Sequence, residues 1–254
     1  MLLIKQIPVL NDNYLFMIYD QTTRTSGCVD PAVSEPLINE LEKENLGLDF
    51  ILNTHHHFDH VGANLDLKKK YGCKIVGSQK DSKRIPGIDI MLGEGDIFNF
   101  GRSTCRVLEV SGHTNGHIAF YFKEDNCIFC GDTLFSLGCG RLFEGSPKQM
   151  VESLSKIRSL PDHTKIYCAH EYTLNNAEFA LSIDPKNGVL KRKVLEIKEK
   201  RSQNIPTVPA LLSEEKKLNP FLNFDNKEFI KRIGIEDISS TDNFRVIREM
   251  KDKF

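Results

Sequence analysis

The segment from Thr54 to His60 concentrates side chains that could bind metal ions. It reads Thr-His-His-His-Phe-Asp-His and follows a short apolar run. Neutral imidazole and carboxylate groups are ligands of zinc and of harder divalent ions. On an irregular turn, His55 and His57 can face one way while Asp59 and His60 reach another. The spacing therefore predicts a loop that can serve two ions, whereas the alternative is an accidental run of surface histidines or a satisfied core histidine.

Three further candidate ligands follow other strand-like runs. One or two residues separate His113, Asp132 and His170 from a preceding apolar run, and each is directly preceded by a glycine or an alanine. Sites in layered α/β domains gather where strands give way to loops. We therefore expect these three side chains to join the loop after Thr54 in a metal site.

The other histidines carry simpler interpretations. His56 should point away from the ions, and His117 is expected to hydrogen-bond to a ligand rather than to bind metal itself. His163, beside a proline and an aspartate, is expected at the surface.

The elements that must position these residues alternate between strand and helix. Strand-length apolar runs and amphipathic helical patterns follow one another up to about Tyr172, which predicts a layered α/β domain over residues 1–173. The expected strands are 14–19, 49–52, 74–76, 106–110, 118–122, 127–130 and 165–168, and the expected helices are 34–45 and 147–159.

Beyond residue 173 the pattern is that of helices only. The expected helices are 175–183, 188–203, 227–233 and 241–253. Proline-containing segments separate them, as is typical of helix boundaries. We therefore expect a smaller all-α domain over residues 174–254.

The ligand pattern resembles that of the metallo-β-lactamase superfamily. The resemblance implies a four-layer αββα sandwich with a two-metal site between its two β-sheets. It assigns His55, His57 and His113 to the first ion, and Asp59, His60 and His170 to the second, with Asp132 bridging both. Two divalent ions are implied, zinc above all, with iron or manganese also suited to the second half.

Motifs along the whole chain narrow the resemblance to the glyoxalase II (hydroxyacylglutathione hydrolase) family. They are Asn11-Asp12-Asn13-Tyr14, Val29-Asp30-Pro31, the segment 54–60, His113 to His117, residues 131–135, residues 138–145, His170-Glu171-Tyr172-Thr173, residues 219–222, and Arg248 with Lys251. The resemblance implies hydrolysis of S-D-lactoylglutathione and other S-2-hydroxyacylglutathiones to glutathione and a 2-hydroxy acid, in methylglyoxal detoxification.

The same resemblance implies which residues hold the glutathione half of the substrate. They are Arg141, Leu142, Phe143, His170, Glu171, Tyr172, Arg248 and Lys251. Some members of the family have a tyrosine where this chain has Phe143. Glutathione carries two carboxylates, which cationic side chains would recognise. The alternative for Arg248 and Lys251, three residues apart on one helix face, is an ordinary solvated cationic surface.

Such a site needs no serine or cysteine nucleophile. Metal coordination lowers the pKa of water toward about 7, so a hydroxide shared by the two ions could attack the thioester carbonyl, with the ligands Asp59 and Asp132 as the catalytic residues. A thiol with a pKa of about 8.5 leaves readily as an anion.

Two other classes of function remain open at this point. One keeps the fold and changes the substrate to a β-lactam, a lactone or a phosphodiester. The other is a non-catalytic metal-binding module, which would be expected to lose ligands, whereas all seven are present. A flavin-linked di-iron oxidoreductase would be expected to carry a carboxylate in place of His57.

Composition limits the partners. The net charge of −1 offers no global field for nucleic acid, and no apolar run is long enough to span a membrane. We see no secretory leader and expect a cytoplasmic protein. The seven cysteines are an odd number without framework spacing, which favours buried, reduced thiols. We expect a monomer.

Overall fold

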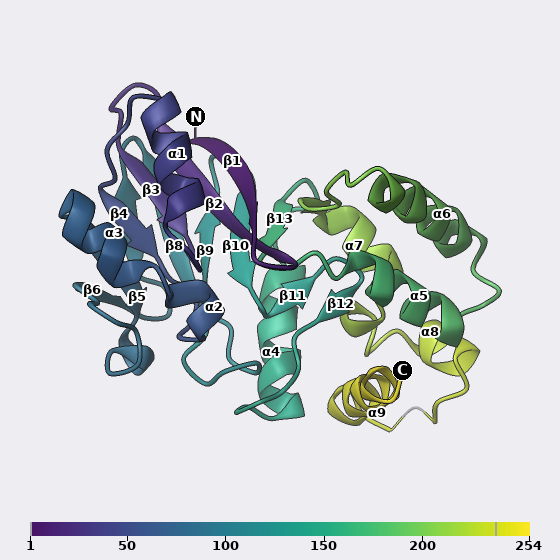
Figure 1. The fold of residues 1–254 in the computed structure, drawn as a ribbon. Helices are drawn as coiled ribbons and strands as arrows, with labels where there is room; N and C mark the ends of the chain where they lie inside the picture. The colour runs from purple at the N-terminus through teal and green to yellow at the C-terminus, as the bar shows by residue number, and fades with distance from the viewer. Residues whose placement is uncertain (1, 237) are drawn as a thin grey trace.

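Two six-stranded sheets face each other in the computed structural model, which describes residues 2–236 and 238–254 (Figure 1). The strands of the first sheet lie in sequence order: β1 (Leu2–Val9), β2 (Asn13–Asp20), β3 (Ser26–Val29), β4 (Phe50–Leu52), β5 (Lys74–Ser78) and β6 (Ile90–Leu92). The first three strands are antiparallel, and β3 to β6 are parallel.

The second sheet has the order β14-β13-β10-β9-β8-β7. Its strands are β7 (Ile97–Phe100), β8 (Ser103–Glu109), β9 (Ile118–Phe122), β10 (Cys127–Gly131), β13 (Lys165–Cys168) and β14 (Ala210–Leu211). Strands β10 and β13 are parallel, whereas the other neighbours pair antiparallel. A small hairpin, β11 (Leu134–Phe135) and β12 (Gly138–Cys139), projects between the sandwich and the C-terminal helices (Figure 1).

Helices cover the sandwich and form a separate cluster near the C-terminus (Figure 1). The α-helices are α1 (Glu35–Lys43), α2 (Phe58–Val61), α3 (Asn64–Tyr71), α4 (Pro147–Arg158), α5 (Thr173–Ile183), α6 (Gly188–Ser202), α7 (Leu212–Leu218), α8 (Lys227–Arg232) and α9 (Ser240–Asp252), and two 3₁₀ turns span Gln79–Asp81 and Pro220–Leu222. None of the described helices is both long and apolar enough to cross a bilayer.

Both faces of the first sheet are buried, as strand β2 illustrates. Its side chains alternate, so that Phe16 and Ile18 enter the core between the two sheets. Leu15 and Met17 instead pack in the separate core beneath α1 and α3. Helix α4 covers the second sheet and adds Leu154 to the larger core. This arrangement confirms the predicted four-layer α/β sandwich followed by helices.

One expectation about the C-terminal part is wrong. Residues after 173 are not exclusively helical, because Ala210 and Leu211 form β14, which pairs antiparallel with Ile166 and Lys165 of β13. A two-residue strand directly after Pro209 is too short to show any alternation of apolar and polar residues. Its pairing depends on the exposed edge of β13, which the local sequence does not reveal. The boundary between domains 1–173 and 174–254 stays a prediction.

A buried carboxylate lies at the seam between the hairpin and helix α7. Glu215 is 2% exposed and accepts hydrogen bonds from the hydroxyl of Ser136, the backbone N–H of Leu137 and the amide of Asn219. No cation is among these partners. Burial therefore raises the pKa of Glu215 from its ordinary value near 4.5 to about 7.

This shift predicts a pH-dependent stability. The unfolded chain loses the Glu215 proton near pH 4.5, whereas the folded chain keeps it until about pH 7. Folding stability should therefore fall as pH rises from 4.5 to 7, by on the order of 3 kcal/mol. Glu215→Gln presents the same hydrogen-bonding shape without a titration. Melting temperatures across this range should decline for the wild type relative to the variant, and parallel curves would contradict the burial argument.

Candidate active site

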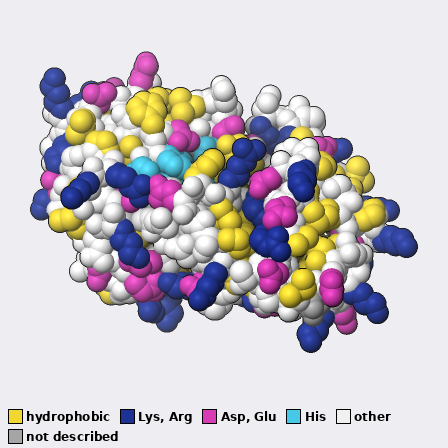
Figure 2. Space-filling view, turned by 90° about the horizontal axis from the view of Figure 1, so that it is seen from below, with side chains coloured by type: hydrophobic (Ala, Val, Ile, Leu, Met, Phe, Trp, Pro, Cys, Tyr) yellow, Lys and Arg dark blue, Asp and Glu magenta, His cyan; other side chains and the backbone are white. Residues whose placement is uncertain are grey.

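All seven predicted ligands meet at one edge of the sandwich. His55 to His60 follow β4, His113 follows β8, Asp132 follows β10 and His170 follows β13. Histidine side chains gather at one place on the face seen from below (Figure 2). The sheet ends thus bring together residues that are more than 100 positions apart.

The first group consists of three imidazoles. The Nδ1 atom of His57 lies 3.1 Å from Nε2 of His55 and 3.0 Å from Nε2 of His113. Ligand nitrogens around a tetrahedral zinc ion lie roughly 3.3 Å apart, so the spacing suits such an ion. Burial and the neighbouring imidazoles lower the pKa of His55 and His57, and burial lowers that of His113. The rings are therefore neutral and can bind metal.

The second group combines two imidazoles with two carboxylates. Nε2 of His60 lies 3.4 Å from Oδ2 of Asp59 and 3.5 Å from Oδ1 of Asp132. Nε2 of His170 lies 3.5 Å and 3.4 Å from the same two oxygens. Nε2 of His60 and Oδ1 of Asp132 are buried without a hydrogen-bond partner. Orphaned buried polar atoms are costly, and a bound cation would satisfy both.

Asp132 faces both groups. While its Oδ1 is directed to His60 and His170, its Oδ2 lies 3.5 Å from Nε2 of His113. Burial alone would raise the pKa of Asp132, but the charges of His170 and His60 outweigh burial and hold the pKa far below its usual range. Asp132 is therefore an anion between the two groups, and these donors fit a pair of divalent ions.

Hydrogen bonds behind the ligands orient their rings. Nδ1 of His60 lies 3.1 Å from Asp30, and Nδ1 of His113 lies 2.9 Å from the carbonyl oxygen of Arg141. His117 accepts a hydrogen bond from the backbone N–H of Asp132, which matches the supporting role expected of it. Such outer contacts set which ring nitrogen is free for metal.

The other two histidines lie outside the groups, as expected. Nδ1 of His56 is 3.2 Å from Asp81, away from the candidate ligands. His163 is exposed.

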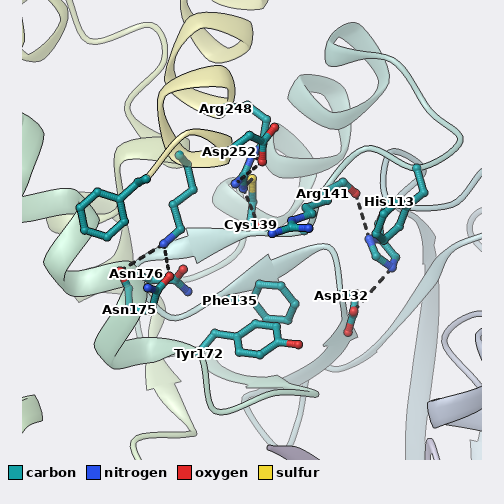
Figure 3. Close-up of a pocket in the computed structure, with 14 residues that line it drawn as sticks. His113, Asp132, Phe135, Cys139, Arg141, Tyr172, Asn175, Asn176, Arg248 and Asp252 are labelled. Atoms are coloured by element: carbon teal, nitrogen blue, oxygen red, sulfur yellow. Dashed lines mark hydrogen bonds and ion pairs between the residues drawn. The ribbon is translucent and has the colours of Figure 1, made fainter.

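A cavity of about 510 Å³ extends from the candidate metal site toward helix α9 (Figure 3). His113 and Asp132 line one end, and Arg248 and Lys251 line the other. Arg141 also lines the cavity, and its guanidinium has no ion pair within the described part of the chain. The cavity thus joins the ligand cluster to cationic side chains that come from two parts of the fold.

Aromatic side chains form further walls. Tyr172 stacks on His170 with ring centroids 4.7 Å apart and planes 5° apart. Phe143, which is 64% exposed, places its ring edge-on to His113 at 5.1 Å. Leu142 lines an adjoining hollow together with Arg141 and Phe143. These residues lie where a substrate entering the cavity would pass.

Arg248 differs from the solvated cation that its sequence position allowed. It is 6% exposed, and its Nε and Nη2 donate to Asp252 at 3.1 and 2.8 Å. Nη1 donates to the carbonyl oxygen of Cys139 at 3.0 Å, and the guanidinium lies 5.0 Å from the Phe221 ring. Much of its hydrogen-bonding capacity is therefore used inside the protein.

Glu171 does not line the cavity, contrary to its expected contact with substrate. Its carboxylate accepts hydrogen bonds from the hydroxyl of Tyr14 at 2.7 Å and from the backbone N–H of Thr207 at 2.9 Å. These bonds turn the side chain toward the segment before β14. Glu171 therefore connects the sandwich to the helical part instead of facing a ligand.

Asn175 and Asn176 line the cavity wall, although neither was among the expected site residues. Asn175 accepts hydrogen bonds from the Lys251 ammonium, and Asn176 donates to the carbonyl oxygen of Ser136. Both lie on α5 shortly after Tyr172. The helical spacing of Tyr172 and Asn175, three residues apart, was the available signal.

Two family models match consecutive parts of the chain. Residues 27–170 match the metallo-beta-lactamase superfamily, and residues 171–254 match the hydroxyacylglutathione hydrolase C-terminus. Among solved structures, that of ETHE1 from Myxococcus xanthus is similar with a TM-score of 0.68 at 23% identity, covering 97% of this chain and 96% of that one. That similarity concerns the fold.

The chain is also similar over its full length to hydroxyacylglutathione hydrolases. The hydroxyacylglutathione hydrolase of Methylococcus capsulatus is 48% identical, covering 100% of this chain and 99% of the relative. That of Rippkaea orientalis is 50% identical, covering 99% of each. With this identity over the whole length, and with both family models matched, the chain belongs to the hydroxyacylglutathione hydrolase family within the metallo-beta-lactamase superfamily.

Proposed function

We propose that this chain is a thioester hydrolase that converts S-D-lactoylglutathione, and other S-2-hydroxyacylglutathiones, to glutathione and a 2-hydroxy acid. The observation that carries the proposal is that one cavity has Asp132 and His113 at one end and Lys251 at the other. Such a cavity suits a ligand with a reactive carbonyl and an anionic peptide. The family relationship supports the same reaction.

Two divalent ions, most simply zinc, would be held by the seven ligands. His55, His57 and His113 would hold one, and Asp59, His60 and His170 the other, with iron or manganese also suited to the second. Asp132 would contact both because its two oxygens face the two groups. The ions would acidify a water molecule and polarise the thioester carbonyl.

The protein's own residues would supply position and charge. Asp132 and Asp59 keep low pKa values, so both remain anionic acceptors at neutral pH. The departing glutathione thiol has an ordinary pKa of about 8.5 and needs no general acid from the protein. The chemistry of the ligand set therefore suffices without a nucleophilic side chain.

The glutathione peptide would lie along the cavity. Arg141 and Lys251 would meet its carboxylates, Tyr172 would pack against the peptide beside His170, and Arg248 would shape the wall. Residues 174–254 would then form a substrate-binding domain on the catalytic domain 1–173. Because each of these residues comes from the same chain, we propose that a monomer is active. The seven buried free thiols support a reducing, cytoplasmic setting, where the reaction would serve methylglyoxal removal.

A substrate panel tests the reaction class. Zinc-reconstituted protein should hydrolyse S-D-lactoylglutathione far faster than a β-lactam, a lactone or a phosphodiester. Faster hydrolysis of the β-lactam, the lactone or the phosphodiester would show that the cavity binds that class of substrate instead. Two bound ions without hydrolysis of any of them would instead support the non-catalytic metal-binding module.

The proposed role of Lys251 predicts a pH dependence of substrate binding. Burial, together with the nearby charges of Arg248 and Arg141, lowers the pKa of Lys251 to about 8. The ammonium is charged below this pH and neutral above it, so KM for the glutathione thioester should rise as pH passes upward through 8. Lys251→Arg keeps its charge and should remove this step in the KM profile. Identical profiles for the two proteins would rule out Lys251 as the titrating contact.

A further inference from the structure

The turn between β1 and β2 reaches the end of β13, although more than 150 residues separate them (Figure 1). The backbone N–H of Tyr14 donates to Ala169 at 2.7 Å, and that of Glu171 donates to Asp12 at 2.8 Å. Asn13 and His170 form an isolated antiparallel bridge. The turn is thus fastened on both sides of His170.

Two side chains of this segment contact candidate ligands of the second group. Oδ1 of Asp12 lies 2.8 Å from Nδ1 of His170. The Asn13 amide donates to Oδ2 of Asp59 at 2.9 Å and to the Asp59 backbone oxygen at 3.3 Å. Asn13 is 7% exposed, so solvent does not readily replace its hydrogen bonds.

These contacts determine which atoms face the second group. With Asp12 on Nδ1, the His170 ring presents Nε2 to the oxygens of Asp59 and Asp132. Asn13 bonds the same Asp59 oxygen that lies 3.4 Å from His60. A carboxylate oxygen has capacity for both an amide donor and a cation.

The first group is supported by other elements. Nδ1 of His55 lies 3.1 Å from the Thr54 hydroxyl, and Nδ1 of His113 contacts the carbonyl oxygen of Arg141. Within residues 2–236 and 238–254, neither Asp12 nor Asn13 hydrogen-bonds to a histidine of the first group. The β1–β2 turn therefore acts on one half of the site.

We infer that Asp12 and Asn13 are positioning residues that set the affinity of the second metal ion independently of the first, an inference that rests on the two-ion site proposed above. Outer contacts of this kind change metal affinity by about 10- to 100-fold. Loss of either side chain should therefore convert two tight sites into one tight and one weak site.

Metal binding itself tests this inference, without any measurement of turnover. Metal-free wild type, Asn13→Ala and Asp12→Ala would be titrated with zinc against a chromophoric chelator. We expect the first equivalent to bind as in the wild type and the second to bind about 10- to 100-fold more weakly. Asp12→Asn keeps an acceptor for the His170 N–H, so the second zinc ion should be weakened less in this variant than in Asp12→Ala.

Asn11→Ala serves as the matched control, because Asn11 is an exposed residue of the same turn. It should bind both ions as the wild type does. If the buried Asn13 variant fails to fold, the Asp12 variants carry the test, since the Asp12 side chain is 40% exposed.

Two results would overturn the inference, and they differ in what they mean for the two-ion site. A wild type that binds two ions, with variants that bind both equally well or lose both equally, overturns the inference and leaves the proposed function standing. A wild type that saturates at one ion overturns the two-ion site and the inference with it.

Discussion

Asp132→Ala should abolish nearly all thioester hydrolysis. In the structure, the two carboxylate oxygens face different imidazole groups, so the substitution removes a ligand from each half at once. Stabilisation by a correctly held metal pair amounts to several kcal/mol, and we therefore expect kcat to fall about a thousandfold or more. Steady-state kinetics with metal analysis of the same sample measures both effects.

Two controls separate this effect from general damage. Asp132→Asn keeps the shape of the side chain but loses its charge, and should also be severely impaired. Asp66→Ala removes an exposed carboxylate of α3 and should be close to wild type. Turnover near normal in Asp132→Ala would mean that the bridging assignment is wrong.

Arg248→Ala and Lys251→Ala should separate stability from substrate binding. Arg248 is buried, and its loss leaves the Cys139 carbonyl without this donor and Phe221 without its cationic neighbour. We expect a loss of about 2–4 kcal/mol in stability, together with a raised KM. Thermal melting measures the first effect.

Lys251 is more accessible and contacts Asn175 at the cavity wall. Its replacement by Ala should leave the melting temperature nearly unchanged. KM should rise by roughly ten- to a hundredfold, because loss of a charge-assisted hydrogen bond weakens binding by about that factor. A thioester that lacks the glutathione peptide should be indifferent to this change. An unaltered KM for the glutathione thioester in a folded Lys251→Ala protein would show that Lys251 does not bind the glutathione peptide.

The ligand cluster could be predicted because its signals are local. His113, Asp132 and His170 each follow an apolar run that became a strand end, and strand ends meet at one edge of the sandwich. The segment from His55 to His60 holds four of the seven candidates. Order along the chain and residue type were sufficient for this part.

The direction of a side chain depends on tertiary contacts, and here the sequence was insufficient. Glu171 stands directly beside His170, yet Tyr14 and Thr207 hold its carboxylate away from the cavity. The helical spacing of Arg248 and Lys251 placed them on one face but did not reveal that Asp252 and Cys139 enclose Arg248. Each partner except Asp252 comes from a distant segment.

The contacts of the motif from Asn11 to Tyr14 could not be predicted from the sequence either. Its residues contributed to the family resemblance, but no local pattern indicated which side chains they would contact. Their role emerged from the pairing of the turn with the end of β13, which depends on the packing of the two sheets.

One titration tests directly whether the chain is a two-ion thioester hydrolase. Metal-free protein would receive zinc in stepwise equivalents while turnover of S-D-lactoylglutathione is measured in the same sample. We predict that bound metal saturates at two per chain and that turnover reaches its maximum with the second ion. Saturation at one ion with full turnover would contradict two-ion catalysis, and no hydrolysis of the thioester with two ions bound would contradict the proposed reaction.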